Sequence, residues 1–223
     1  MTTDIQSLLG GVLPFWNKLS AAEKAQMAAG TRLKNFAAGA VVTGVRNSCP
    51  GMLVVLSGSI RCYILSEEGR DFTLFRLAPG DVCVLSASCL LSRIRFEVVL
   101  ETECECSVSI TNTAIVAEVS KNNVWAENFL YKVLADRFSN VIDAVQNVMF
   151  RSLDQRLAAF LLEETKRGSS DLVPLTHEKI ALYIGSSREC VSRRLKQFAE
   201  RQIVESSRGG VAVKDKKALE AML

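Results

Sequence analysis

The chain has 223 residues, of which 48% are apolar and 23% are charged. This is ordinary usage for a folded protein, so the composition excludes disordered, collagenous and purely coiled-coil classes. The length exceeds that of an average domain and favours two modules. The net charge is only +3, yet residues 1–149 hold 13 Lys and Arg against 14 Asp and Glu (−1), whereas residues 150–223 hold 14 against 10 (+4). Five basic residues against two acidic ones fall within residues 186–201, which suggests a polyanionic partner, although a solvated helix face would show the same charge.

The N-terminal segment and the cysteines bear on where the chain is expected to work. The first 16 residues contain no Lys or Arg, and no run in the chain reaches the 18 apolar residues that a membrane span needs. The seven cysteines are an odd number and are scattered through apolar sequence, which argues against a disulfide framework. We therefore expect a cytoplasmic protein with no membrane contact and with reduced, mostly buried thiols.

A short helix and then a series of strands are predicted for the first half of the chain. Ser20, with Glu23 three residues later, is a typical start for a helix that runs to Ala29. Short apolar runs punctuated by glycine follow, which is typical of an antiparallel sandwich or barrel. Residues 67–70 are expected to form a hairpin loop, and the sheet is expected to extend to about residue 117. The apolar runs span residues 41–42, 52–56, 60–65, 72–77, 96–100 and 104–110.

A long amphipathic helix is predicted from Asn123 to Met149. Apolar residues at spacings of 4, 3, 4 and 3 fall on one stripe of it. We name this stripe the seam; it consists of Leu134, Phe138, Val141, Val145 and Val148. The seam indicates a dimer interface, although a helix packed only on its own domain would show the same pattern. A second set widens the face enough to contact the β domain as well: Leu130, Val133, Ile142 and Met149.

The helical period continues after residue 150. Leu153, Leu157, Phe160 and Leu161 predict a helix over residues 151–167, and the sequence Gly168-Ser169-Ser170 predicts the loop that ends it. We therefore place the boundary between the two modules near residue 150.

The most informative segment spans residues 176–197, THEKIALYIGSSRECVSRRLKQ. Thr176 can cap a first helix, and Gly185 suits the left-handed conformation that ends it. Ser186 is expected to open a second helix, with Glu189 completing a capping box. Two short helices joined by a glycine-containing turn form a helix-turn-helix. Its expected inward residues are Ile180, Ala181, Ile184, Val191, Leu195 and Phe198.

The outward side of the second helix has the chemistry of major-groove recognition. The planar fork of arginine matches O6 and N7 of guanine, and a carboxylate accepts from N4 of cytosine. We predict that Arg188, Glu189 and Arg193 read bases, although Glu189 could instead serve only the capping box. The histidine of the chain, His177, is expected to be an exposed neighbour of the helix cap. The full set predicted to bind DNA is Thr176, Ser187, Arg188, Glu189, Ser192, Arg193, Lys196 and Arg208.

Residues 203–213 read as a β-hairpin with a Gly-Gly turn, which would form a wing beside the helix-turn-helix. Arg208 at its tip could contact phosphate or could be a solvated loop arginine.

With these residues in place, the sequence resembles the CRP/FNR family of bacterial transcription regulators over nearly its whole length. The family's recognition helix has the form S-R-E-x-V-x-R-x-L, and residues 187–195 read SRECVSRRL. The segments VVLSGSIRCYIL and EEGRDFTLFRLAPGD are similar to the family's cyclic-nucleotide-binding roll, and residues 123–149 are similar to its dimer helix.

The resemblance implies an α+β fold of three parts. Residues 1–119 would form an antiparallel β-roll sensor domain of jelly-roll type, residues 120–150 a dimerisation helix, and residues 151–223 a winged helix-turn-helix. It also implies a homodimer that binds an inverted-repeat DNA operator and works with RNA polymerase. In the family, the residues matching Arg188, Glu189 and Arg193 read bases and favour a TGTGA-like half-site. Ser192 occupies a position that some members use, which leaves a TTGAT-like half-site open.

The sensor domain departs from the members that bind cyclic AMP. Val84 and Leu85 stand where those members have glycine and glutamate, Ile94 stands at the arginine position, and Val141 and Ile142 replace two hydroxyl residues. Burying a nucleotide's polar edge against these residues would cost roughly 1–3 kcal/mol for each hydrogen bond left unmade. We therefore expect no cyclic AMP binding, unless a register shift brings Arg93 or Arg95 to the phosphate. The residues predicted to line an effector pocket are Leu85, Ser86, Ser88, Arg93, Arg95, Val141 and Ile142.

Other cofactors of the family fit no better. Iron–sulfur members cluster cysteines in an N-terminal extension, whereas the first cysteine here is Cys49. In the haem members, Cys83 would match a cysteine ligand, but the histidine position is Leu85. A redox or metal-responsive role for Cys83/Cys89 or for Cys104/Cys106 stays an alternative to buried, inert thiols. The sequence does not identify an effector.

Two further function classes fit the sequence less well than a DNA-binding regulator. A small-molecule-binding module whose helix-turn-helix contacts protein would not need the intact set Arg188, Glu189 and Arg193. No nucleophile triad, phosphate loop or metal-spaced cluster supports an enzyme, and the single histidine of the sequence removes most acid/base schemes.

Overall fold

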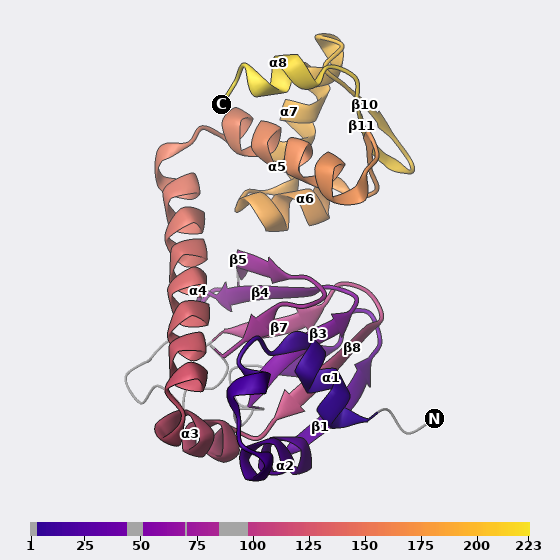
Figure 1. The fold of residues 1–223 in the computed structure, drawn as a ribbon. Coiled ribbons are helices and arrows are strands. Elements are labelled where there is room, and N and C mark those ends of the chain that lie inside the picture. Colours follow the sequence, from indigo (N-terminus) through magenta and orange to yellow (C-terminus); the bar gives the residue numbers. More distant parts are fainter. Residues whose placement is uncertain (1–3, 44–50, 70, 85–97) are drawn as a thin grey trace. The chain divides into compact units, whose positions relative to one another are not determined.

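The computed structural model describes residues 4–43, 51–69, 71–84 and 98–223. The chain divides into two units, one made of Met1–Leu65 and Leu74–Val141 and the other of Ser66–Thr73 and Ile142–Leu223. Strands and short helices make up the first, helices and a small hairpin make up most of the second, and a long helix runs from one into the other (Figure 1). The α+β class, with antiparallel N-terminal sheets, a long helix and C-terminal helices, is confirmed.

Within the described residues, strands β1 to β8 form two four-stranded sheets, and every pairing resolved within them is antiparallel. One has the order β1-β8-β3-β6, with β1 at Thr31–Phe36, β8 at Cys106–Thr111, β3 at Met52–Ser57 and β6 at Val82–Cys83. The other has the order β2-β7-β4-β5, with β2 at Val41–Thr43, β7 at Val99–Thr102, β4 at Ile60–Leu65 and β5 at Asp71–Leu77.

The central strand β3 is buried on both of its faces. Met52 and Val54 belong to a core cluster that includes Leu9, Met27 and Val116 from the helices. The alternate residues of the strand are equally inaccessible and point to the opposite face. The helices on this side are α1 (Ile5–Val12), the 3-10 turn η1 (Trp16–Lys18) and α2 (Ala21–Ala29). The capping box predicted for α2 is confirmed, since the Glu23 backbone N–H donates to Ser20 Oγ and the Ser20 N–H donates to Glu23 Oε2.

One sequence expectation for this unit was wrong, and one strand was missed. The sheet does not extend to residue 117, because β8 ends at Thr111 and Asn112 caps helix α3 (Thr113–Asn122) by accepting from the Ala114 N–H. Val116 and Val119 then face the core at helical spacing. Strand β1 was not predicted at all; it lies at the edge of its sheet and buries only Thr31, so its sequence lacks an apolar run.

Helix α4 (Val124–Phe150) packs on the first unit with one stripe of its surface. Ala126, Val133 and Arg137 are its buried residues, and Leu130 and Leu134 lie partly buried against the same core. The Arg137 guanidinium donates to Val82 O at 3.1 Å and to Asp81 Oδ1 at 3.0 Å, and it lies 5.2 Å from the centroid of the Phe75 ring. A charged residue thus fixes the helix to the sheet.

The second unit has its own apolar core. Helix α5 (Leu153–Gly168) begins with a capping box at Ser152 and ends at Ser169, which is in the left-handed conformation. Strand β9 (Leu172–Val173), helices α6 (His177–Ile184) and α7 (Arg188–Glu200), the hairpin β10 (Val204–Ser207) and β11 (Gly210–Val213), and helix α8 (Lys216–Glu220) follow. The core is formed by residues from all of these elements, and the sheet order is β10-β11-β9. Within the described part of the chain, no helix combines the length and apolar character needed to cross a bilayer.

Candidate nucleic-acid interface

The first helix of the helix-turn-helix has the predicted ends. Thr176 Oγ1 accepts from the Lys179 backbone N–H at 3.2 Å and so caps α6. Gly185 has φ 62° and ψ 54°, the left-handed conformation, and its N–H donates to Ala181 O. The Ser186 N–H also donates to Ala181 O, at 3.0 Å. These bonds close the end of α6 and turn the chain sharply into α7.

A side chain of α5 holds this turn in place. Arg156 Nη1 donates to Ile184 O at 2.6 Å and to Gly185 O at 3.0 Å. Carbonyls at a helix C-terminus lack partners within the helix and carry partial negative charge, so a guanidinium is a suitable donor to them. The angle between α6 and α7 is therefore fixed by a hydrogen-bonded arginine as well as by apolar packing.

The second helix starts one residue later than the sequence suggested. Ser187, not Ser186, is the N-cap, and its Oγ accepts from the Cys190 N–H at 3.3 Å. Glu189 therefore does not form the capping box expected with Ser186. Its carboxylate is exposed, and hydrogen bonds from its own backbone N–H and from the Ser187 hydroxyl hold the pKa of the Glu189 carboxyl below its usual value.

Helix α7 is divided between a buried and an exposed face. The predicted inward residues Val191, Leu195 and Phe198 are fully buried. The polar residues form two rows at a spacing of four, which places each row on one side of the exposed face. Arg188, Ser192 and Lys196 form one row, and Glu189 and Arg193 form the other; all are exposed except Ser192, which is half-buried.

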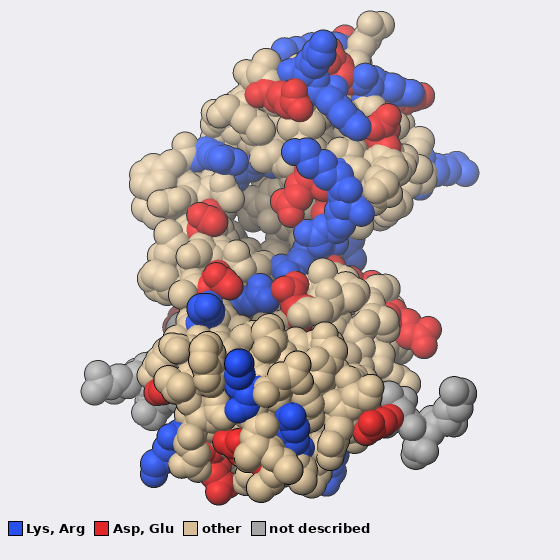
Figure 2. Space-filling model, viewed as in Figure 1, with Lys and Arg blue, Asp and Glu red and all other residues tan. Residues whose placement is uncertain are grey.

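Another arginine of α7 serves the fold instead of the exposed face. Arg194 Nε lies 3.1 Å from Asp154 Oδ1 on α5, and Arg194 Nη1 donates to Gln197 Oε1 at 2.9 Å. The surface around these elements is nevertheless rich in positive charge: Lys and Arg side chains gather over the C-terminal elements, with fewer acidic side chains between them (Figure 2).

His177 is not the exposed cap neighbour that the sequence suggested. It is half-buried, and its Nδ1 lies 2.9 Å from Ser192 Oγ on α7. This contact joins the two helices at the border of the exposed face. An open groove of about 710 Å³ begins there, lined by His177, Ser192, Lys196, Ala199, Gln202, Val204, Glu205, Ser206 and Lys214.

The predicted wing is a hairpin, but its turn lies one residue earlier than expected. Ser207 pairs with Gly210, so Arg208 and Gly209 form the two-residue turn. The Gly209 N–H donates to Ser207 Oγ at 3.2 Å, and Arg208 is exposed at the tip. Gly210 has φ 134°, and a Cβ there would overlap the carbonyl oxygen of Val173.

Most of the expected effector residues belong to a segment outside the described part of the chain. Leu85, Ser86, Ser88, Arg93 and Arg95 lie outside the described residues, as does Ile94. The other two expected residues are on α4, where Val141 is half-buried and Ile142 is 40% exposed.

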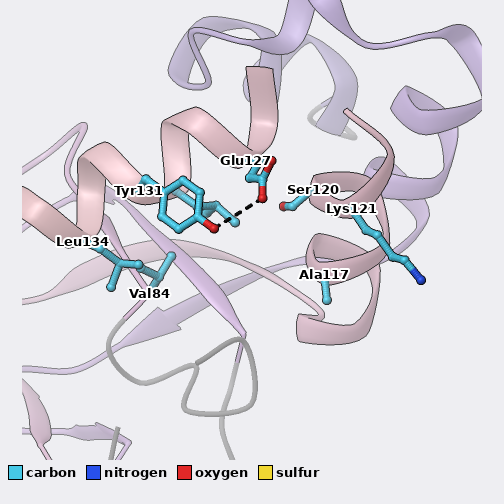
Figure 3. A pocket seen from close by; sticks show the side chains of 8 residues that line it. Val84, Ala117, Ser120, Lys121, Glu127, Tyr131 and Leu134 are labelled. Atoms are coloured by element: carbon cyan, nitrogen blue, oxygen red, sulfur yellow. Dashed lines mark hydrogen bonds between the residues drawn. The ribbon is translucent and has the colours of Figure 1, made fainter. Parts of the chain in front are cut away.

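The first unit contains a cavity of about 270 Å³ between α3, α4 and the end of β6 (Figure 3). Val84, Ala117, Leu130 and Leu134 supply its apolar wall. Its remaining lining residues are Ser120, Lys121, Glu127 and Tyr131. The Tyr131 hydroxyl donates to Glu127 Oε1 at 3.3 Å and the Ser120 hydroxyl donates to Val116 O, while the Lys121 ammonium points away from Tyr131 (Figure 3). Ser120, Glu127 and Tyr131 thus bind one another or the backbone.

The described cysteines are free thiols: Cys62, Cys83, Cys104, Cys106 and Cys190. Burial raises the pKa of the Cys62 thiol well above its usual value and also raises that of Cys106. The protonated thiol is the unreactive form, so burial works against redox chemistry at these two residues. Cys49 and Cys89 lie outside the described residues, and the described part of the chain holds no cluster of three His, Cys, Asp or Glu suited to a metal ion.

Comparisons with known proteins agree with this architecture. Residues 155–222 match the model of the Crp-like helix-turn-helix domain. A crystal structure of a crp/fnr-family transcriptional regulator from Eubacterium rectale is 37% identical, covers 95% of this chain and 98% of its own, and superposes with a TM-score of 0.90. The cyclic AMP receptor protein of Thermus thermophilus is 27% identical over 76% of this chain and 77% of its own length. The nitrogen fixation regulation protein FixK of Bradyrhizobium diazoefficiens is 25% identical over 92% and 88%.

These relatives are regulators of transcription and not enzymes. The Eubacterium rectale regulator matches both units at 37% identity, and the domain model matches the helix-turn-helix whose geometry is described above. The chain belongs to the CRP/FNR family of transcription regulators, with a helix-turn-helix as its DNA-binding element.

Proposed function

We propose that the protein is a homodimeric regulator that recognises an inverted-repeat operator through α7. The observation that carries this proposal is the division of α7, whose apolar side closes the core of the second unit while Arg188, Glu189 and Arg193 are exposed. Arginine and carboxylate side chains on an exposed helix can read guanine and cytosine in the major groove. Lys196 and Arg208 would contact phosphate, and Thr176 and Ser187 lie at the N-termini of the two helices, where backbone N–H groups suit an anion.

The dimer is supported by a second surface. On α4, the stripe packed on the first unit runs through Ala126, Val133 and Arg137, whereas Phe138 of the seam is 67% exposed and Val145 and Val148 are 38% and 39% exposed. Tyr131, 58% exposed, lies seven residues before Phe138 and extends the same stripe. A large apolar stripe in solvent needs a partner, and a second copy of the helix would supply a self-complementary one.

This proposal retains the domain organisation expected from the sequence. Residues 1–119 form the sensor, residues 120–150 the dimerisation helix and residues 151–223 the DNA-binding domain, which would act with RNA polymerase as family members do. We expect the sensor not to bind cyclic AMP, since Val141 and Ile142 offer no hydroxyl to a nucleotide base. Isothermal titration calorimetry with cyclic AMP should give no binding heat; micromolar affinity with one site per subunit would contradict this part.

The test of the function itself is a binding selection with the purified full chain and a random DNA library. Two recognition helices related by a two-fold axis should enter successive major grooves, so the selected sites should be pseudo-palindromes with half-sites about one helical turn apart. By family resemblance, a TGTGA-like or TTGAT-like half-site is expected. Recovery of no inverted repeat would refute DNA reading by α7 and favour a helix-turn-helix that contacts protein.

A further inference from the structure

A side chain of α6, His177, lies at hydrogen-bond distance from Ser192 of the recognition helix α7. His177 is the first residue of α6, and Ser192 lies in the second turn of α7. His177 Nδ1 and Ser192 Oγ are 2.9 Å apart, which is hydrogen-bond distance, and both side chains are half-buried. One partner is therefore held by the first helix while the other belongs to the row that faces the proposed operator.

Ser192 lies in a position to contact DNA. It is the middle residue of the row whose other members, Arg188 and Lys196, are exposed. It also lines the open groove that continues toward the wing. A DNA strand that contacts Arg188 and Lys196 would thus approach the Ser192 hydroxyl.

The protonation of His177 Nδ1 determines whether the Ser192 hydroxyl can donate a hydrogen bond to DNA. A serine hydroxyl has one proton and two acceptor lone pairs, and a neutral imidazole has one donor and one acceptor nitrogen. If Nδ1 accepts the serine proton, only the lone pairs of Ser192 remain for DNA. If Nδ1 carries a proton and donates it, the serine proton is free for a DNA acceptor. We propose that His177 is a positioning residue that determines whether the Ser192 hydroxyl donates to the operator or accepts from it.

This inference rests on the function proposed above and adds a specificity determinant to it. As a donor, Ser192 would match phosphate oxygens, O6 or N7 of guanine, or O4 of thymine; as an acceptor, it would match the amino groups of adenine or cytosine. The same recognition helix could therefore prefer different bases at one operator position according to the protonation of a residue on another helix.

The protonation of His177 is set by its surroundings. Burial, and then the positive charge of Arg188, lower the pKa of the His177 imidazole below its usual 6.5. The charged groups that line the adjoining groove are Lys196 of α7 and Glu205 and Lys214 of the hairpin. At neutral pH the ring is uncharged and either tautomer is available. Below the lowered pKa both nitrogens carry protons, so Nδ1 must donate and Ser192 becomes a donor to DNA.

A double-mutant cycle on the selected operator tests the contact. His177→Phe keeps the ring volume and removes the nitrogen, and Ser192→Ala removes the hydroxyl. Each should weaken operator binding about fivefold, the value of one net hydrogen bond. The double variant should bind no more weakly than either single variant, because both changes remove the same interaction. Multiplication of the two losses, to about 25-fold, would overturn the proposal.

The pH dependence separates positioning from support of the fold. Selections at pH 8 and at a pH below the lowered pKa of His177, located by NMR titration of its ring, should give wild type a preference that moves toward guanine or thymine at the Ser192 position as the pH falls. His177→Phe should show no such shift. His177→Asn places an amide near the position of Nδ1 but does not titrate, so it should restore affinity without restoring the shift. An equal shift in all three proteins, or no shift in wild type, would overturn the inference.

Different results would contradict the positioning role of His177 and the DNA-binding function proposed above. Wild type that selects an inverted repeat, with His177 and Ser192 contributing independently, removes the positioning role and leaves the proposed function intact. Wild type that selects no operator at either pH removes the proposed function and this inference with it.

Discussion

Arginines in the core of the first unit and on the exposed face of α7 have opposite roles. In the first, Arg137 is buried among a carboxylate, a carbonyl and an aromatic ring, and the Arg76 guanidinium lies 2.9 Å from the Glu103 carboxylate with both side chains mostly buried. In the second, Arg188 and Arg193 extend from α7 into solvent. A guanidinium with protein partners on several sides fixes the fold, whereas one at an exposed helix face stays available to a polyanion. Arginine count alone therefore does not locate a DNA-binding surface; the partners of each arginine do.

The largest expected effect is on dimerisation, from a substitution in the seam of α4. Val145→Glu places like charges face to face in the proposed dimer, so the dissociation constant should rise by at least about 100-fold, equivalent to about 3 kcal/mol. Gln146→Glu adds the same charge to an exposed neighbour on another side of the helix and should leave the dimer intact. Analytical ultracentrifugation measures both, and a dimer of unchanged affinity in Val145→Glu would mean that the seam is not the interface.

The next largest effect is on stability, and it should differ between a buried and an exposed arginine. Arg137→Met removes the donor to Val82 O and the partner of Asp81, and should lower the free energy of unfolding by about 2–3 kcal/mol. Arg188→Met, at an exposed position, should change it by less than about 0.5 kcal/mol. Chemical denaturation gives both values. Equal destabilisation by the two substitutions would show that the buried contacts of Arg137 do not stabilise the fold.

Arg193→Ala should lower operator affinity by about 1–3 kcal/mol and relax the preference at one guanine, because the variant loses a bidentate contact to a base edge. Its stability should match wild type, since the residue is exposed. Fluorescence anisotropy with operators altered at single positions provides the measurement. Unchanged sequence preference in this variant would count against base reading by α7.

The smallest effect is expected for Lys196→Ala. A lysine that touches only phosphate carries no sequence information, so all DNA sequences should be weakened similarly. The slope of log affinity against log salt should fall by about 1. A salt titration on operator and on random DNA distinguishes this from Arg193→Ala, and a change confined to the operator would assign Lys196 to a base.

Features encoded within one helix were predictable from the sequence. The buried side of α7 follows from the spacing of Val191, Leu195 and Phe198, and the left-handed Gly185 follows from its place after an apolar helix. The helix start was missed by one residue because Ser186 and Ser187 are equally suitable caps, and only the backbone conformation selects between them.

Features that depend on contacts between elements were not predictable. His177 and Ser192 are 15 residues apart and meet only because the turn brings α6 and α7 together at a particular angle. Arg137 finds its carbonyl partner 55 residues earlier in the chain. Neither pair has a local spacing that would distinguish it. Helix α3 was missed for a different reason, since its β-branched residues favour strand while the Asn112 cap and the packing of Val116 favour helix.

The wing shows how such a regulator can diversify. Gly210 combines a positive φ with a backbone carbonyl where a Cβ would lie, so this position accepts glycine and little else. Gly209, in the turn itself, has only the Ser207 hydroxyl near the position of a Cβ, at 3.7 Å, and Arg208 is in solvent. The base of the hairpin is thus rigidly specified while its tip is tolerant of change. The charge at the tip can therefore be changed by substitution without disturbing the packing of the second unit.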